Sequence, residues 1–121
     1  QSLLIEAVEY YEEALQIFKE ALGDRHPSVA TTLSNIADVY DDQGRYEEAL
    51  AYYEEALQIL KEALGNRHPD VATTLHNIAS VYKAQGRDEE ALAYYEEALS
   101  ISKEALGDRH PSVATTLSNI A

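Results

Sequence analysis

The chain repeats itself with a period of 42 residues, and this periodicity limits the possible folds more than any other feature. Residues 23–64 and residues 65–106 are identical at 33 of 42 positions. A third copy begins at Gly107, and its fifteen residues repeat residues 23–37 without a change. Residues 4–22 follow the second half of the same unit. The repeat therefore accounts for essentially the whole chain.

Each unit contains two stretches with the spacing of an amphipathic helix. In the first, Val29, Leu33 and Ile36 fall on one side of a helix. The second runs over residues 46–64 and is rich in strong helix formers, with alanines every seven residues that would let a neighbouring helix approach closely. Gly44 separates the two, because glycine readily adopts the left-handed conformation that ends a helix. The first stretch is called helix A and the second helix B.

The expected fold is all-α, with six helices in the order B, A, B, A, B, A. Short connections between them predict antiparallel neighbours. One helix hairpin cannot bury both of its apolar sides, so successive units must stack into an α-solenoid. We expect a single repeat array over residues 1–121. Its predicted units are 1–22 (partial, helix B), 23–64 (full), 65–106 (full) and 107–121 (partial, helix A).

The composition limits the kinds of partner. The chain carries 22 acidic and 9 basic side chains, a formal charge of −13. Nucleic acid and anionic membranes are therefore unfavourable partners, since both attract clustered Lys and Arg. A basic protein would be attracted, although solvated helix faces explain the charge better than a specific partner does. There is no cysteine, no signal-peptide pattern and no apolar run long enough to span a bilayer, so we expect a cytoplasmic protein.

The two full units differ at nine positions, and four of these predict a binding surface. The four lie in helix A and are Ser34/His76, Asp38/Ser80, Asp41/Lys83 and Asp42/Ala84. Their spacing places them on one helical face, while the apolar positions of helix A do not change. A surface tuned unit by unit explains this pattern, and drift of exposed positions is the alternative. The face is acidic in the first full unit and mildly basic in the second.

The pattern of large and small residues through Leu33, Ile36, Tyr40, Gly44 and Ala56 resembles that of the tetratricopeptide repeat. The unit here is longer than the usual repeat of about 34 residues. Its pattern, HPxVATTLxNIAxVYxxQGRxEEAL, is similar to the repeats of kinesin light chains and of NTPase-linked immune-type receptors in fungi and bacteria. The first residues depart from it: the sequence Ser-Leu-Leu-Ile at 2–5 replaces Gly-Arg-Tyr-Glu.

This resemblance implies a right-handed superhelix in which A helices line a concave groove that binds peptides or partner proteins. It implies neither catalysis nor a cofactor. The predicted groove residues are Thr31, Ser34, Asn35, Asp38, Asp41, Asp42, Thr73, His76, Asn77, Ser80, Lys83, Ala84, Thr115, Ser118 and Asn119. The asparagines among them would hydrogen-bond either a bound peptide backbone or groups of a neighbouring unit.

Other patterns favour structural roles. His26, His68 and His110 each precede a proline and recur every 42 residues, too far apart to share a metal, so we expect turn or capping residues. Glutamate pairs recur in every unit, as is typical of solvated helix faces and not of one active site. In the Tyr52-Tyr53 pair, one ring should pack and the other should reach water or the next unit. We predict no catalytic or metal site.

Two functions remain, and the enzyme class is the least favoured. The first is a scaffold that binds a protein or peptide in the A-helix groove. The second is a structural module that stacks head to tail through uncovered apolar faces at its two ends. An excerpt of a longer array would have the same ends covered by neighbouring repeats. The near-identity of the copies fits a recent duplication and a designed array equally well.

Overall fold

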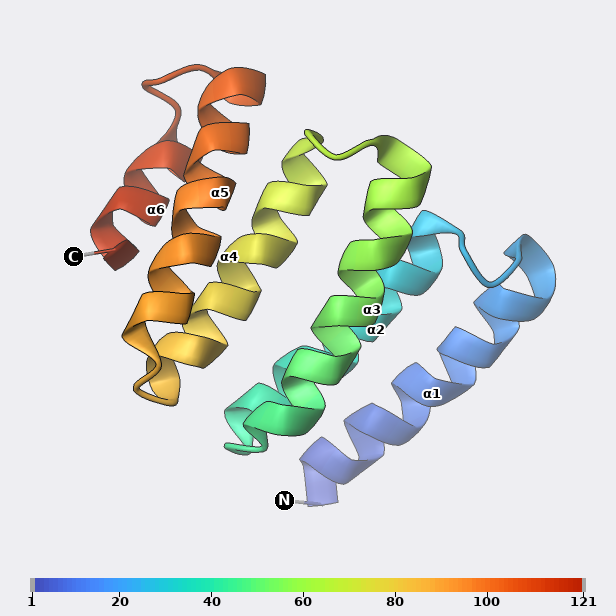
Figure 1. Cartoon of the computed structure of the whole chain (residues 1–121). Helices are drawn as coiled ribbons and strands as arrows, with labels where there is room; N and C mark the ends of the chain where they lie inside the picture. Colours follow the sequence, from blue (N-terminus) through green and yellow to red (C-terminus); the bar gives the residue numbers. More distant parts are fainter. Residues whose placement is uncertain (1, 121) are drawn as a thin grey trace. The chain divides into compact units, whose positions relative to one another are not determined.

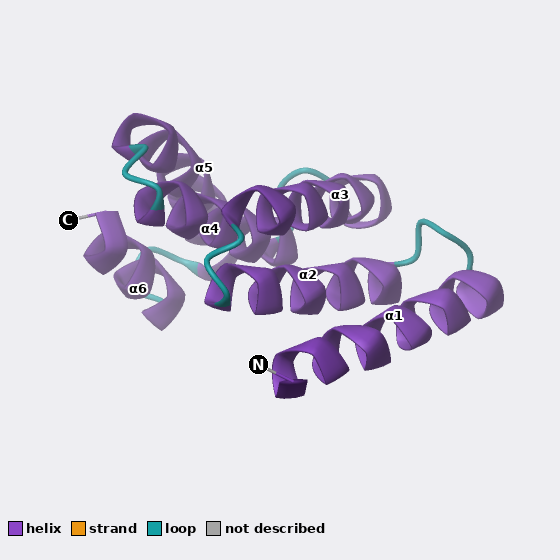
Figure 2. Ribbon diagram, turned by 90° about the horizontal axis from the view of Figure 1, so that it is seen from below, coloured by secondary structure: helices purple, strands orange, loops and turns teal. Residues whose placement is uncertain are grey.

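The computed structural model describes the backbone of residues 2–120 and the side chains of residues 6–120. The regular structure in this range is helical throughout, in helices joined by short loops (Figures 1 and 2). The helices are α1 (Ser2–Leu22), α2 (Pro27–Asp42), α3 (Tyr46–Leu64), α4 (Pro69–Ala84), α5 (Asp88–Leu106) and α6 (Pro111–Ile120). The predicted all-α class is confirmed. The departures from the repeat pattern at residues 2–5 concern side chains outside the described residues.

The chain divides into two compact units, Gln1–Ala63 and Leu64–Ala121. The first contains α1, α2 and nearly all of α3, and the second contains α4, α5 and α6. Helices α2, α4 and α6 are A helices, and α1, α3 and α5 are B helices. The single array predicted over residues 1–121 stays a prediction.

Each A helix begins at a histidine that caps it. The Nδ1 atoms of His26, His68 and His110 accept a hydrogen bond from the backbone N–H two residues later, at 3.0, 3.0 and 3.1 Å. Proline follows each histidine in the first turn, where its missing N–H costs nothing. The predicted capping role is therefore confirmed, and it satisfies one of the backbone donors that every helix start leaves free.

Helix α2 ends in a Schellman motif around Gly44, whose φ is +75°. The Gly44 N–H donates to the Asp41 carbonyl at 2.9 Å, and the Arg45 N–H donates to the Tyr40 carbonyl at 2.8 Å. Helix α4 ends in the same way at Gly86. Glycine is required because a Cβ atom is strained at this φ. The chain turns sharply here and enters the following B helix after three residues.

In the first unit, the core comes from the apolar face predicted for helix A. Val29, Leu33 and Ile36 of α2 are at most 1% exposed, and Ala56 and Ile59 of α3 are completely buried. Burial of a side chain of this size stabilises a fold by about 1.5–3 kcal/mol. The alanine period does not extend through α3, because Ala63 is exposed one residue before the helix ends.

The second unit repeats this core. Val71, Leu75 and Ile78 of α4 are at most 1% exposed, and Ile101 of α5 is completely buried. Helix α5 packs against both α4 and α6. Val113 of α6 completes the buried set.

The tyrosine pairs of the B helices divide as predicted. Tyr53 and Tyr95 are 2% and 3% exposed, while Tyr52 and Tyr94 are half-buried. The half-buried rings stack on tyrosines of the A helices, with centroids 5.5 Å apart for Tyr40–Tyr52 and 5.4 Å for Tyr82–Tyr94. The Arg45 guanidinium lies 4.6 Å from the centre of the Tyr40 ring, within the range of a cation–π contact.

The α1–α2 loop and the α3–α4 loop are each fastened by an ion pair to a B helix of the same unit. The Arg25 guanidinium donates two hydrogen bonds of 2.9 Å to the Glu62 carboxylate. Arg67 makes the corresponding pair with Glu104, and also donates to Ser100 Oγ at 2.9 Å. These hydrogen bonds hold the pKa values of Glu62 and Glu104 below their usual range. Both pairs are about half exposed, so solvent screens them and each adds little to the stability of the fold.

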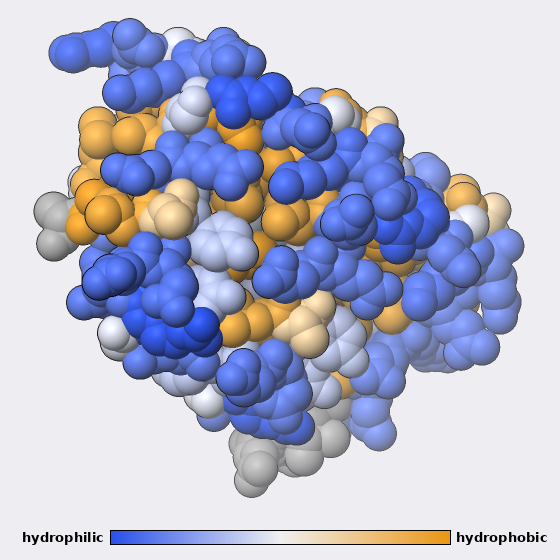
Figure 3. Space-filling view, in the orientation of Figure 1, coloured by the Kyte–Doolittle hydropathy of each residue, from blue (hydrophilic) through white to orange (hydrophobic). Residues whose placement is uncertain are grey.

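Hydrophilic residues cover much of the molecular face in Figure 3, with apolar residues visible between them. No helix among the described residues combines the length and apolar character needed to cross a membrane.

Candidate binding surface on the A helices

The structure leaves every predicted groove residue accessible to solvent. Each of the fifteen is exposed or half-buried, whereas Leu33, Ile36 and Ala37, which lie between them on α2, are at most 1% exposed. An A helix therefore has one side in the core and another side facing solvent. Within each unit, the structure also connects some of these residues to helices that sequence reasoning had not linked with them.

In the first unit, the accessible side of α2 is acidic near its C-terminal end. Asp38 accepts a hydrogen bond from the buried Tyr53 hydroxyl of α3. Burial, followed by this hydrogen bond and the Asp38 charge, raises the pKa of Tyr53 strongly. The pKa of Asp41 is raised by burial and by the nearby charges of Asp42 and Asp38. Because these carboxylates repel one another, a cation bound here would relieve the repulsion.

In the second unit, the same tyrosine meets a neutral partner. The Tyr95 hydroxyl lies 3.0 Å from Ser80 Oγ, at the position that Asp38 occupies in the first unit. The B-helix tyrosine is thus the same in both units, whereas the A-helix residue that its hydroxyl contacts differs between them. Sequence reasoning placed these tyrosines in the core but missed their hydroxyl contacts. The spacing of residues within one helix does not show which residue of the neighbouring helix a hydroxyl will meet.

His76 is packed among three helices of the second unit. Its ring meets the Tyr95 ring edge-on, with centroids 5.3 Å apart. Its Nε2 atom lies 3.0 Å from Asn119 Nδ2, and its Nδ1 atom lies 3.5 Å from Thr116 Oγ1. Burial lowers the pKa of His76. Of the two roles predicted for the asparagines, Asn119 therefore fills the second, since it satisfies a group of the neighbouring repeat.

Lys83 also reaches α6. Its Nζ atom donates to the backbone carbonyl of Asn119 at 2.7 Å, so this cation stabilises the C-terminal part of α6. The basic residue that replaces Asp41 in the second unit therefore also makes a contact within the protein. Lys83 remains exposed and retains donors for a ligand.

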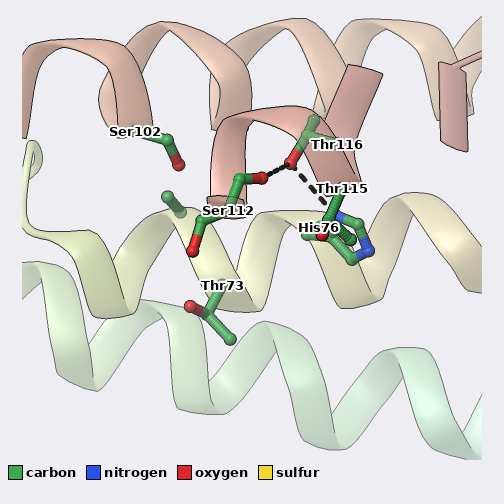
Figure 4. A pocket seen from close by; sticks show the side chains of 7 residues that line it. Thr73, His76, Ser102, Ser112, Thr115 and Thr116 are labelled. Carbon is green, nitrogen blue, oxygen red and sulfur yellow. Dashed lines mark hydrogen bonds between the residues drawn. The ribbon is translucent and has the colours of Figure 1, made fainter. Parts of the chain in front are cut away.

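A cavity of about 180 Å³ opens between α4, α5 and α6 (Figure 4). It is lined by Ala72, Thr73, His76, Ser102, Ser112, Thr115 and Thr116. Thr73, His76 and Thr115 were predicted as groove residues, but Ser102 was missed. The signal was present in the sequence, because Ser102 replaces the Leu60 of the preceding unit. Within the described part of the chain, no three His, Asp or Glu side chains converge as metal ligands.

The tetratricopeptide repeat profile matches residues 1–62, 42–104 and 70–121. The chain is 44% identical over 43 residues to human mitochondrial tetratricopeptide repeat protein 19, which covers 36% of this chain and 11% of that protein. The chain thus spans about a tenth of the length of this relative.

Two crystal structures resemble the chain over nearly all its length, each at 28% identity. BtubC (BKLC) from P. vanneervenii gives a TM-score of 0.88 over 98% of this chain and 48% of that one. The nearly identical TPR-like repeats of a putative kinesin light chain from P. anserina give 0.83 over 97% and 56%. This chain thus spans about half the length of each of these two proteins.

The N-terminal domain of stress-induced protein-1 from C. elegans shares the fold, with a TM-score of 0.61 at 15% identity, over 97% of this chain and 96% of that one. Together these likenesses confirm the predicted helical-repeat solenoid class. Tetratricopeptide repeats generally mediate protein–protein interaction and scaffolding, and the repeat is typically not catalytic. The chain belongs to the tetratricopeptide repeat family.

Proposed function

We propose that this chain is a non-enzymatic scaffold that binds a protein or peptide on the accessible face of its A helices, in the groove that the family resemblance implies. One observation carries the proposal. The positions of the A helices that vary between units remain accessible to solvent, while the unchanged apolar positions of the same helices are buried. An A helix that varies along its accessible side and keeps its buried side constant is what a ligand-binding surface requires.

The electrostatics of the first unit favour a ligand with basic character. Asp38, Asp41 and Asp42 project from two adjacent turns of α2, and burial together with the charges of the other two aspartates raises the pKa of Asp41. A Lys or Arg side chain placed here would gain charge-assisted hydrogen bonds and remove the repulsion between these charges. The net charge of −13 adds long-range attraction for such a ligand and opposes nucleic acid.

A peptide array followed by affinity measurement of its hits tests this proposal. Replacing Asp38, Asp41 and Asp42 together by Asn removes three charges and keeps an acceptor for Tyr53. We expect at least about tenfold weaker binding, because each charge-assisted bond contributes about 1.5–3 kcal/mol. The control replaces Glu47, Glu54 and Glu55 of α3 by Gln, which changes the net charge equally and should leave affinity unchanged at high ionic strength. An array without hits, or hits that the triple Asn variant still binds equally, would contradict the proposal.

A second candidate function is self-association of copies through apolar surface. Tyr10 and Ile17 of α1 are 71% and 57% exposed, and Leu117 of α6 is 49% exposed. The counterparts of Ile17 and Leu117 in the repeat are covered: Ile59 is 0% exposed and Leu75 is 1% exposed. Light scattering against concentration separates the two functions, since growth in mass that Ile17→Glu abolishes, without any peptide hit, favours self-association.

The remaining expectations belong to the same proposal. We place the chain among long, 42-residue tetratricopeptide repeats of the kinesin-light-chain kind, as part of one longer array, because the chain spans about half of the structures it resembles. Such an array would cover the apolar side chains of α1 and α6 with further repeats. A cytoplasmic location remains the prediction from the sequence.

A further inference from the structure

The cavity between α4, α5 and α6 is lined by polar side chains, and the hydroxyl of one of them, Ser102, has no hydrogen-bonding partner in the described part of the chain. Ser102 is 6% exposed, and its hydroxyl makes no hydrogen bond to another described residue, so its oxygen is free to face the cavity. Figure 4 shows this hydroxyl pointing from α5 into the cavity, toward the space between Ser112 and α4. A polar side chain this little exposed normally has a hydrogen-bonding partner, so the Ser102 hydroxyl is available to a group that enters the cavity. The first unit carries Leu60 at this position, so the hydroxyl is not required by the repeat.

The hydroxyl hydrogens of the threonines around the cavity already take part in hydrogen bonds within the protein. The hydroxyls of Thr73, Thr115 and Thr116 each donate to a backbone carbonyl four residues earlier, at 3.3, 3.1 and 3.1 Å. Their oxygens can therefore only accept a hydrogen bond from a ligand. The hydroxyls of Ser102 and Ser112 still have a hydrogen to donate, since neither donates to another described residue. The cavity thus offers several acceptors and a few donors.

The lining contains no carboxylate and no permanent cation. A ligand ammonium would lose its hydration without gaining a counter-charge, and a carboxylate would find too few donors. His76 does not supply a positive charge, because its burial lowers its pKa and its ring nitrogens face Thr116 and Asn119. An apolar group would leave the hydroxyls of Ser102 and Ser112 without a hydrogen-bonding partner. A neutral group with both donors and an acceptor matches best.

The size of the cavity points to one side chain and not to a whole small molecule. Its volume of about 180 Å³ exceeds several times the roughly 30 Å³ that a water molecule takes in the liquid. It falls below the roughly 300–1,000 Å³ of pockets that enclose drug-sized ligands. Thr73, Ser112 and Thr115 at the rim are exposed, so a side chain can enter from the accessible face of the A helices.

We propose that this cavity receives the primary carboxamide of a glutamine or asparagine side chain of the bound polypeptide. The two N–H groups of the carboxamide donate to the threonine oxygens, and its carbonyl accepts from Ser102 and Ser112. This inference deepens the proposed scaffold function and rests on it. Ser102 is then a specificity-determining residue: because the first full unit carries Leu60 at this position, the two units would bind different side chains of the ligand.

The test is a titration of the isotopically labelled full chain followed by NMR amide shifts. The probe is N-acetyl-glutamine N-methylamide, and the matched probes carry glutamate, lysine or norleucine in its place. We expect saturable shifts at Thr73, His76, Ser102 and Thr115 with the glutamine probe. The other three probes should bind at least fivefold more weakly. Equal binding of any of them, or shifts spread over other parts of the chain, would overturn the proposal.

Two substitutions make the test specific. Ser102→Leu introduces the residue that the first unit carries and fills the cavity, so we expect at least tenfold weaker binding of the glutamine probe. Asn66→Asp also restores a first-unit residue, but in a loop, and should leave binding unchanged. Ser102→Ala removes only the hydroxyl and should weaken binding about threefold or more, which keeps the test decisive if the leucine variant folds poorly. Retained binding in both Ser102 variants would refute the assignment.

These outcomes are independent of the scaffold test. If peptide hits depend on the aspartates of α2 while the glutamine probe does not bind, the scaffold stands and the carboxamide site is wrong. If the probe binds but no polypeptide does, the cavity exists and the scaffold function fails.

Discussion

The Nε2 atom of His76 lies 3.0 Å from the Nδ2 atom of Asn119, so a hydrogen bond joins α4 to α6. The neighbouring copies of the repeat carry Ser34 and Ser118 where this unit carries His76. The bond requires an unprotonated nitrogen on the ring, and burial lowers the pKa of His76 accordingly. This hydrogen bond between α4 and α6 therefore depends on a neutral histidine.

Acidification should weaken the second unit through His76. Since the folded-state pKa lies below the unfolded value of 6.5, the unfolded chain binds a proton first as the pH falls. The neutral ring contributes its whole stabilisation above pH 6.5, and this stabilisation is lost as the pH falls from there through the folded-state pKa. Urea unfolding at about pH 7.5 and about pH 5.5 should show a larger loss for the wild type than for His76→Ser. Equal losses in the two proteins would contradict this.

Removing the Tyr53 hydroxyl should destabilise the chain more than removing its counterpart in the second unit. Tyr53 donates to the Asp38 carboxylate, whereas Tyr95 pairs with the neutral Ser80 hydroxyl. Tyr53→Phe should cost about 2 kcal/mol and Tyr95→Phe about 1 kcal/mol, as expected for charged and neutral hydrogen bonds. Denaturant unfolding measures both values. Tyr10→Phe is the control, because Tyr10 is 71% exposed and should change little.

Asp41→Asn should stabilise the chain slightly at neutral pH. The raised pKa of Asp41 means that the folded state holds this proton more tightly than the unfolded chain does. Stability from this group therefore increases as the pH falls through the folded pKa, and the charged form is the unfavourable one. The gain from Asn is below about 0.5 kcal/mol for a site this accessible. It should shrink as the pH is lowered, and a gain that persists in acid would show another cause.

The histidine caps should be replaceable by another side chain that accepts a hydrogen bond. His26→Ala removes the acceptor for the Ser28 N–H and should cost about 1 kcal/mol. His26→Asn restores an acceptor at the cap, and most of the lost stability should return. Thermal unfolding of the two variants provides the comparison. If both lose the same stability, the cap bond does not contribute and the ring acts through packing.

Much of the fold was readable from the sequence, because the determining interactions act between residues close together in the chain. The spacing of Leu33 and Ile36 predicted which side of helix A is buried. The capping role of His26 and the helix end at Gly44 followed from the nearest few residues. The alanine period failed at Ala63, because burial near a helix end depends on what lies opposite, and periodicity contains no information on that.

The sequence by itself determined the six helices, their caps and the stripe of accessible variable positions on the A helices. Only the tertiary structure decided that Asp38 meets Tyr53, that His76 bonds Asn119, and that Ser102 points into a cavity. The physical reason is distance along the chain. A helix sets its own faces within about one turn of 3.6 residues. Contacts between residues 15 or 43 positions apart depend on how whole helices pack and on where each side chain ends.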